Sequence, residues 1–250
     1  MKNKLGQNFL TDKNIAKREI EYAEISNKDT VLEIGPGKGI LTNILAEKAK
    51  KVIAIEYDKD LISNLERILP ENVELIHGDA VRIDFNTLTR FNKVVSNLPF
   101  QISSKITFKL LNYSFDIAVL IYQKEFASRM IANAGTKDYS RLSVNVYYRA
   151  YCDILGTIPK SCFNPTPKVD SCIVKLTPRE KPAFYVIDEN FFFEFTRNLF
   201  NNRRKKINTI LHRFYDINID EISFRNNRAE ELTPEQLGEL CNIIFTSLNS

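Results

Sequence analysis

The 250-residue chain has no tryptophan, only two histidines and only four cysteines. His77 and His212 lie far apart in the sequence, and no two cysteines form a Cys-x-x-Cys pair. Because zinc and iron–sulfur sites need several such ligands at short spacing, we expect no metal site. We expect the four cysteines to be reduced thiols of a cytoplasmic protein.

Long apolar segments are also missing. The run Ile117–Tyr122 has only the length of a strand, and Glu194 interrupts the apolar stretch at Phe191–Phe193, so neither reaches the length of a membrane span. The basic N-terminus leads directly into polar residues, and we therefore expect no signal peptide. With 44% hydrophobic residues, a chain of this length can bury one sizeable core and a small appended domain.

A glycine-rich segment, Gly35-Pro36-Gly37-Lys38-Gly39, follows the apolar run Thr30–Ile34 and precedes the helical pattern of Ile40–Leu45. This order predicts a strand, a tight loop and a helix, because glycine lets the backbone approach a ligand near a helix N-terminus. Ile40 occupies the position of the third glycine in the dinucleotide fingerprint Gly-x-Gly-x-x-Gly. The loop therefore argues against a cofactor that carries a pyrophosphate.

Acidic residues follow the next two predicted strands. Glu56 comes after Val52–Ile55, at the position where doubly wound folds hold the two hydroxyls of a ribose. Asp79 lies in a Gly-Asp-Ala turn after Val73–His77 and offers a carboxylate to the amino group of an adenine. The pattern suits a nucleoside-containing cofactor, either NAD or S-adenosylmethionine.

The segment Asn97-Leu98-Pro99-Phe100 follows the predicted strand Val94–Ser96. Proline fixes φ and supplies no donor, so it holds the Leu98 carbonyl in a stiff turn. Together, Asn97 Oδ1 and this carbonyl can accept both hydrogens of an exocyclic amine, while Phe100 stacks on the ring that bears it. The segment is therefore predicted to bind a planar amine. The alternative is an ordinary strand-ending turn with a core phenylalanine.

Taken together, these motifs resemble the rRNA adenine N6,N6-dimethyltransferases, called KsgA in bacteria, over nearly the whole chain. The matching segments are Leu5–Leu10, Glu33–Gly39, Glu56, Gly78–Ala80, Asn97–Phe100, Gln123–Ala127, Asp138–Val144, Phe163–Ser171, Phe200–Lys205 and Arg228–Thr233. The Phe163–Ser171 segment is also similar to the Erm-type antibiotic-resistance methyltransferases, whereas the last two segments resemble the KsgA branch. The amino-acid sequences of Gln123–Ala127 and Asp138–Val144 resemble those of archaeal and eukaryal members. Many members carry tyrosine at the position of Phe100, but stacking requires only the ring.

The resemblance implies an α/β fold with a Rossmann-like, seven-stranded methyltransferase sheet whose last strand inserts antiparallel, and a small C-terminal helical domain. The strands expected from the sequence are Thr30–Ile34, Val52–Ile55, Val73–His77, Val94–Ser96, Ile117–Tyr122, Cys152–Thr157 and Ser171–Leu176. The proline-containing segment Thr177–Pro182 predicts a linker between a catalytic domain, 1–178, and a helical RNA- or ribosome-binding domain, 183–250. In the latter we expect helices over Asp188–Leu211 and Pro234–Leu248.

The activity implied by the resemblance is SN2 transfer of methyl groups from S-adenosylmethionine to N6 of two adjacent adenosines, in the 3′-terminal hairpin loop of small-subunit rRNA. S-adenosylhomocysteine is the product, and the reaction belongs to small-subunit biogenesis. The predicted cofactor residues are Gln7, Asn8 and Leu10 as a lid, with Gly35, Gly37, Gly39, Glu56, Asp79, Ala80 and Asn97. Catalysis is assigned to Asn97–Phe100, and stacking on the target base to Phe100 and Phe163.

A basic stretch extends from Arg197 to Tyr215 and contains no acidic residue. On one helix, its cations would project together toward phosphates; a merely solvated helix face is the alternative. The residues predicted to contact RNA are Arg197, Arg203, Arg204, Lys205 and Lys206. The expected partners are the small ribosomal subunit and its rRNA. Without a heptad repeat, we expect a monomer.

Three other functions remain open at this stage. An Erm-type enzyme acting on large-subunit rRNA would share the N-terminal site and differ in the C-terminal basic segment. A ribosome-assembly factor that acts mainly by binding would tolerate loss of Asn97, Glu56 and Asp79. A nicotinamide-dependent dehydrogenase would need an acid or base for hydride transfer beside the cofactor, and the two scattered histidines and the misplaced third glycine argue against it.

Overall fold

The computed structural model describes residues 7–215 and 222–249, so Leu5 and Gly6 of the N-terminal motif lie outside the described residues. The chain divides into two compact units. The first comprises Met1–Ala127 and Tyr151–Pro178, and the second comprises Ser128–Ala150 and Arg179–Ser250. The domains expected from the sequence, 1–178 and 183–250, differ from this division because Ser128–Ala150 groups with the C-terminal residues.

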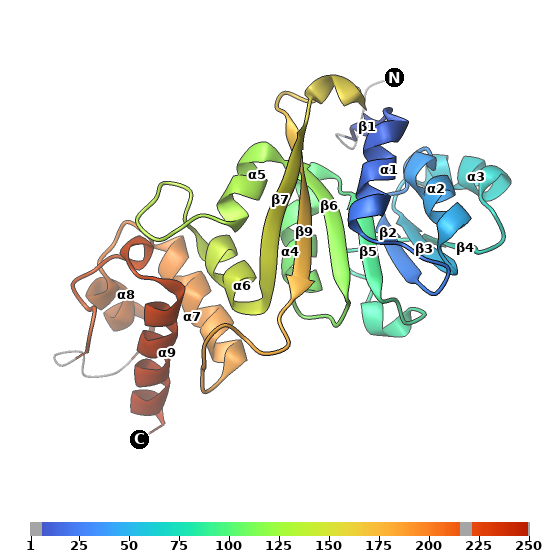
Figure 1. Ribbon diagram of the computed structural model, residues 1–250. Coiled ribbons are helices and arrows are strands. Elements are labelled where there is room, and N and C mark those ends of the chain that lie inside the picture. The colour runs from blue at the N-terminus through green and yellow to red at the C-terminus, as the bar shows by residue number, and fades with distance from the viewer. Residues whose placement is uncertain (1–6, 216–221, 250) are drawn as a thin grey trace. The chain divides into compact units, whose positions relative to one another are not determined.

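A seven-stranded sheet forms the centre of the first unit (Figure 1). In sheet order its strands are β4 (Val73–His77), β3 (Lys51–Glu56), β2 (Thr30–Ile34), β5 (Lys93–Asn97), β6 (Ile117–Gln123), β9 (Ser171–Pro178) and β7 (Ala150–Ile158). The pairs among the first five are parallel, whereas β9 runs antiparallel to β6, with Leu120 opposite Val174. The seven expected strands and the antiparallel insertion of the last one are confirmed.

Helices cover both faces of this sheet (Figure 1). α1 (Lys13–Tyr22) and α2 (Ile40–Lys48) share an apolar cluster with Val119 and Ile121 of β6. Because side chains alternate along a strand, Tyr122 points to the other face, where its hydroxyl lies 2.8 Å from the Thr107 hydroxyl of α4 (Ser103–Leu110). The first unit also contains α3 (Lys59–Ile68). The parallel strands therefore lie inside a three-layer unit, and their carboxyl ends form one open edge.

A second, two-stranded sheet ties down the N-terminal segment. β1 (Phe9–Leu10) pairs antiparallel with β8 (Phe163–Asn164), with Leu10 opposite Phe163. The Thr11 N–H extends this pairing by donating to the Cys162 carbonyl at 2.9 Å. Strands of two residues have no periodic pattern of their own, so this sheet was not expected from the sequence.

The second unit is built from helices around a core rich in phenylalanine. Its helices are α6 (Arg141–Arg149), α7 (Glu189–Asn201), α8 (Ile207–Phe214) and α9 (Pro234–Leu248), and α5 (Lys124–Met130) extends across the division of the chain. Tyr148, Phe192, Phe195 and Leu199 are buried in this core together with apolar residues of α8 and α9. The expected helix Pro234–Leu248 is confirmed, and its N-cap Thr233 accepts the Gln236 N–H at 3.3 Å.

The single helix expected over Asp188–Leu211 is wrong, because the chain turns between α7 and α8. Residues 202–206 carry only amide and basic side chains and have nothing apolar to bury. The turn is closed by the Lys205 N–H, which donates to the Asn202 carbonyl at 2.7 Å. It redirects Ile207, Ile210 and Leu211 into the core. Within the described residues, no helix is long and apolar enough to cross a bilayer.

Candidate active site

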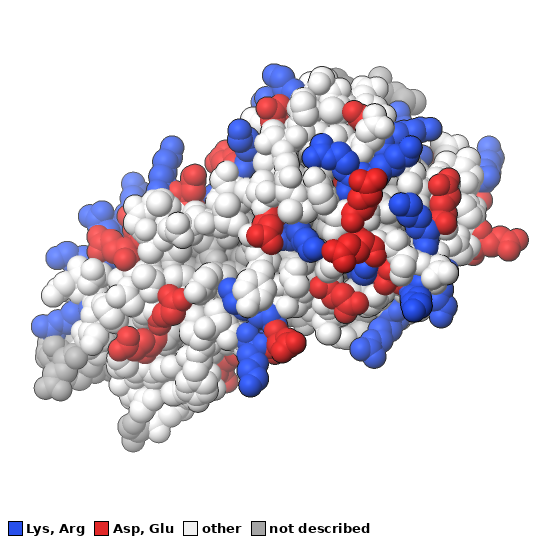
Figure 2. All heavy atoms as spheres, viewed as in Figure 1, with Lys and Arg blue, Asp and Glu red and all other residues white. Residues whose placement is uncertain are grey.

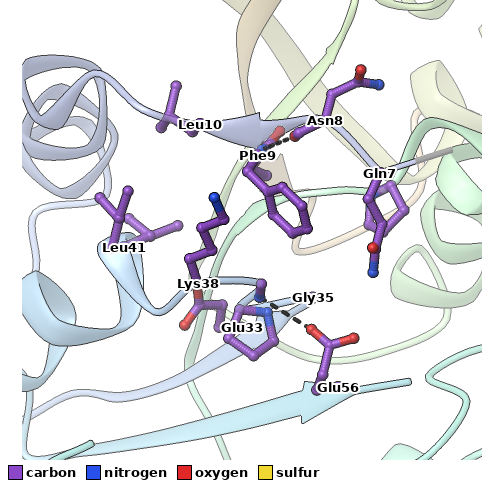
Figure 3. Close-up of a pocket in the computed structure, with 14 residues that line it drawn as sticks. Gln7, Asn8, Phe9, Leu10, Glu33, Gly35, Lys38, Leu41 and Glu56 are labelled. Atoms are coloured by element: carbon purple, nitrogen blue, oxygen red, sulfur yellow. Dashed lines mark hydrogen bonds between the residues drawn. The ribbon is translucent and has the colours of Figure 1, made fainter. Parts of the chain in front are cut away.

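Two adjoining hollows lie at the carboxyl ends of β2, β3, β4 and β5. They share the lining residues Gln7, Gly35, Glu56 and Pro99. The first is completed mainly by the N-terminal segment and the glycine loop, and it contains Asn8, Phe9, Leu10, Glu33, Pro36, Gly37, Lys38, Ile40, Leu41 and Asn97 (Figure 3). The second extends toward β4 and contains Ile34, Ile55, Tyr57, Gly78, Asp79, Ala80, Gln101 and Ile102. The structure thus brings together residues that the sequence predicted separately.

The glycine loop is held between two rings. Gly35 and Gly37 have left-handed φ angles of +76° and +59°, which favour glycine. A Cβ at Gly37 would lie 2.8 Å from the Phe9 ring, and one at Gly35 would lie 3.3 Å from Pro99. Figure 3 shows Phe9 reaching from the N-terminal segment over this loop. A Cβ at Gly37 would therefore force the Phe9 ring to move, whereas one at Gly35 would need only a small shift of Pro99.

Gly39 lies at the end of the glycine loop. It is the N-cap of α2, with a φ of +80°, and it is not among the residues that line the two hollows. Its N–H donates to the Pro36 carbonyl at 2.9 Å. In the structure it closes the turn into α2, and its assignment to the cofactor site stays a prediction.

Glu56 ends β3 with its carboxylate in the shared part of the hollows. Its two oxygens accept the N–H groups of Gly37 at 3.1 Å and of Asp58 at 2.8 Å. Burial raises the pKa of Glu56, while these amide hydrogen bonds oppose the shift. The carboxylate therefore ties the glycine loop to β3 (Figure 3) and leaves lone pairs for further donors.

Glu33 is a lining residue that the sequence prediction of the site omitted. It lies within β2 and is only 2% exposed, and burial raises its pKa to about 8, with the nearby Thr42 hydroxyl opposing the shift and the Glu56 carboxylate adding to it. Its Oε2 atom has no hydrogen-bond partner within the described part of the chain. The signal was a carboxylate inside an otherwise apolar strand, where burial of a charge is costly unless it has a function.

Asn97 ends β5, and its side chain is turned by the N-terminal segment. Its Nδ2 atom donates to the Asn8 carbonyl at 3.3 Å. Because a carbonyl only accepts, the amide nitrogen faces Asn8, which leaves Oδ1 as an acceptor for another donor. The next residue, Leu98, is 1% exposed, and Phe100 is half-buried at the start of a short 3₁₀ turn, Phe100–Ile102.

The Asp79–Ala80 loop forms the far end of the second hollow. Asp79 Oδ1 accepts the Val81 N–H at 2.9 Å, and its other oxygen lies 3.5 Å from Nε of the exposed Arg82 side chain. Ala80 is 4% exposed. A carboxylate and a backbone amide at this position can pair with a base that offers an amine beside a ring nitrogen.

Phe163 does not lie where the base-stacking prediction requires. Its ring is 2% exposed and belongs to the apolar cluster formed with Leu10, Ile158 and Ile173. A ring packed on all sides cannot also stack on a base. We therefore correct this prediction: Phe163 anchors the N-terminal segment through the pairing of β8 with β1.

The predicted RNA-contacting residues lie in the second unit but not on one helix. Arg204, Lys205 and Lys206 are exposed in the turn between α7 and α8. Arg203 Nε donates to Glu230 at 2.6 Å, and Arg197 lies 3.4 Å from Glu194 on α7. On the face that Figure 2 shows, basic and acidic side chains are interspersed. Of the five predicted residues, Arg204, Lys205 and Lys206 thus lie together in the turn. Hydrogen bonds, above all from the Arg228 N–H, lower the pKa of Glu231, and Lys206 is close enough to this carboxylate to lower it further.

No group of three or more His, Cys, Asp or Glu side chains gathers in a suitable arrangement among the residues that the structure describes. All four cysteines are free thiols.

Comparisons with known proteins place the chain among sequence relatives and solved structures. The sequence model of a family described as ribosomal RNA adenine dimethylase matches residues 1–246. A probable ribosomal RNA small subunit methyltransferase A from Methanosarcina acetivorans is 49% identical, covering 96% of this chain and 92% of the relative. One from Methanococcus aeolicus is 46% identical, covering 98% and 97%.

Two solved structures match the fold over nearly the whole chain. The dimethyladenosine transferase from Plasmodium falciparum has a TM-score of 0.79 and 30% identity, covering 96% of this chain and 98% of that one. The 23S rRNA methyltransferase ErmE has a TM-score of 0.66 and 28% identity, covering 97% and 100%.

Proposed function

The chain belongs to the ribosomal RNA adenine dimethylase family, and from this premise we propose that it transfers methyl groups from S-adenosylmethionine to N6 of adenosines in small-subunit rRNA. The dimethylated pair of adjacent adenosines in the 3′-terminal hairpin loop is the finer substrate that the sequence resemblance implies. The observation that carries the proposal is Asn97 at the carboxyl end of β5, lining the same hollow as the glycine loop and turned so that Oδ1 is an acceptor.

The lining residues fit S-adenosylmethionine. The molecule has hydrogen-bond donors at its amino group, ribose hydroxyls and adenine amine, and the hollows offer the carboxyl groups of Glu33, Glu56 and Asp79. The Oε2 atom of Glu33, which has no partner in the described chain, is a buried acceptor of the kind that a bound donor satisfies. When bound, S-adenosylmethionine supplies an electrophilic methyl group on a sulfonium.

Further residues complete this binding site. Gln7, Asn8 and Leu10 cover one side, Gly35 and Gly37 let the backbone approach, and Ala80 offers its amide to the adenine.

Asn97 and Leu98 act on the target amine. Oδ1 of Asn97 and the Leu98 carbonyl accept its two hydrogens and favour a pyramidal nitrogen, whose lone pair then points at the methyl carbon. Attack on a bound S-adenosylmethionine would form the N–C bond as the C–S bond breaks, with S-adenosylhomocysteine as the leaving group. The amine proton becomes acidic as positive charge develops on nitrogen, so no strong base is needed before attack, and the proton passes to solvent after the methyl group is transferred.

Phe100 stacks on the adenine, which leaves its RNA stack to enter the site. Its half-buried ring directly follows the rigid Leu98–Pro99 turn. In the second transfer, a methyl group replaces one amine hydrogen, and a single acceptor then holds the remaining one.

RNA binding is assigned to the second unit, chiefly to the exposed turn cations Arg204, Lys205 and Lys206, and also to the exposed Arg197 of α7. Exposed cations can neutralise phosphates and release counterions. Arg203 is held by Glu230, and we now assign it to the support of this turn. The partner is the small ribosomal subunit with its rRNA, bound by a monomer in the cytoplasm.

The test is transfer of labelled methyl groups to unmethylated small subunits, with large subunits as a parallel substrate. Label in small-subunit rRNA alone is the expected result. Label in large-subunit rRNA would instead favour the activity named for ErmE, whose fold this chain also matches. Tight binding to small subunits without any incorporation would make the chain an assembly factor.

A further inference from the structure

Lys109, which neither the sequence motifs nor the proposed mechanism uses, is bound to the adenine end of the site. It lies on α4, and its Nζ atom donates to the carbonyls of Ala80 at 2.9 Å, of Val81 at 3.3 Å and of Ile83. An ammonium group has three donors, so all of them are used on one loop. The Phe85 ring lies 4.1 Å from Nζ and adds a cation–π contact.

The loop that Lys109 binds, Gly78–Ile83, has no regular secondary structure. Its internal hydrogen bonds close it on itself: Asp79 Oδ1 accepts from Val81, and the Asp79 carbonyl accepts from Arg82 and Ile83 at 2.8 and 2.9 Å. These bonds give the loop a shape but do not attach it to the rest of the unit. Its start is attached by the Gly78 N–H, which donates to the Glu56 carbonyl at 2.8 Å.

Lys109 supplies the second attachment, directly beneath the residues that face the hollow. Gly78, Asp79 and Ala80 line that hollow, and the first carbonyl bound by Nζ belongs to Ala80 itself. Arg82 cannot hold the loop in place of Lys109. Its side chain is 88% exposed, and it comes no closer than 3.5 Å to Asp79, so this ion pair is weak. Burial lowers the pKa of Lys109, while the carboxylates of Asp84 and Asp79 oppose the shift.

We propose that Lys109 is a positioning residue that fixes Asp79 and Ala80 for recognition of the 6-aminopurine of the methyl donor. The proposal rests on the proposed function, because it assumes that this hollow holds adenine. A rigidly attached loop discriminates between an amine and a carbonyl at position 6 of the purine. In a loose loop, Asp79 can turn away from the purine, or a different donor can approach position 6, so a carbonyl there would be tolerated.

The test uses the full chain and two probes, S-adenosylhomocysteine and S-inosylhomocysteine, which has a carbonyl in place of the amine. Lys109→Met keeps the length of the side chain and removes its donors, and Lys109→Arg restores them. Lys105→Met is the matched control, because Lys105 is an exposed lysine on the same helix. Affinities are measured by titration calorimetry.

We expect Lys109→Met to lower the affinity for S-adenosylhomocysteine about tenfold and to shrink the preference over S-inosylhomocysteine by a similar factor. Lys109→Arg should recover most of that preference, and Lys105→Met should stay within about twofold of the parent chain. In methylation assays, KM for S-adenosylmethionine should rise while kcat changes by less than about threefold.

An unchanged preference in Lys109→Met, or an equal loss for both probes, would overturn the proposal and leave Lys109 with a purely structural role. If Lys109→Met does not fold, the same comparison with Lys109→Gln decides, since glutamine keeps only part of the donor set. If the parent chain binds neither probe, it is the proposed function that fails.

Discussion

Glu33 makes the stability of the first unit depend on pH in a direction opposite to that of most carboxylates. Burial raises its pKa from 4.5 to about 8, so between these values the folded chain holds a proton that the unfolded chain releases. Unfolding therefore becomes more favourable as pH rises. The free energy of unfolding falls between pH 4.5 and about 8 and levels off above this range. Glu19 of α1 acts in the same direction: it is fully buried, its carboxyl oxygens have no partner among the described residues, and burial raises its pKa well above the usual range.

The perturbation is Glu33→Gln, which keeps the shape of the side chain and cannot ionise. Each unit of pH between the two pKa values is worth about 1.4 kcal/mol. From pH 5 to pH 7.5, the free energy of unfolding of the parent chain should therefore fall by about 3 kcal/mol relative to that of the variant. The other titrating groups, and most of the contribution from Glu19, change the free energy of unfolding equally in the parent chain and in the variant. The difference between the two free energies therefore reports on Glu33.

Urea unfolding followed by circular dichroism at several pH values between 5 and 8.5 measures this difference, provided that the m-values agree. Glu47→Gln is the control, because Glu47 is an exposed carboxylate on α2. Parallel stability curves for Glu33→Gln and the parent chain would refute the reasoning, since they would mean that Glu33 ionises in the folded protein as it does in the unfolded one.

Three further predictions follow from the site and the basic turn. Gly37→Ala should lower the affinity for S-adenosylhomocysteine at least about tenfold, because the added methyl group would meet the Phe9 ring. Gly135→Ala strains a similar φ of +81° in open space and should leave the affinity unchanged. Equal losses of affinity for the two variants in calorimetry would contradict the explanation by contact with Phe9. Phe100→Tyr should keep kcat/KM for rRNA, whereas Phe100→Ala should lose about 1 to 3 kcal/mol of transition-state binding; an inactive tyrosine variant would argue against stacking. Arg204→Ala should reduce the salt dependence of subunit binding by about one phosphate contact, whereas Arg203→Ala should mainly lower the melting temperature because it leaves Glu230 unpaired; the reverse pattern would exchange their roles.

The sequence was informative where one strong local signal decides the structure. The runs Val52–Ile55 and Ile117–Tyr122 are apolar and bounded by polar residues, so they predict buried strands. The residues at strand ends converge because parallel strands share one carboxyl edge. The place of β9 between β6 and β7 came only from the family resemblance, since register between distant segments leaves no local pattern.

The sequence failed where tertiary contacts decide. Residues 202–206 include no glycine or proline that would mark the end of α7. The turn instead follows from the burial of Ile207 in the core. Phe163 has the residue type for stacking, but packing against β1 and the core uses its ring. Lys109 gave no signal, because its function depends on three carbonyls that only the folded loop brings together.

The central claim is that Asn97 at the carboxyl end of β5 directs methyl transfer to adenine N6. The most direct measurement is mass spectrometry of nucleosides from small-subunit rRNA after reaction of unmethylated subunits with S-adenosylmethionine and either the parent chain or Asn97→Ala. The account predicts N6,N6-dimethyladenosine with the parent chain and none above background with the variant. Dimethyladenosine formed at equal rates by both chains, or a methyl group found on another atom, would contradict it.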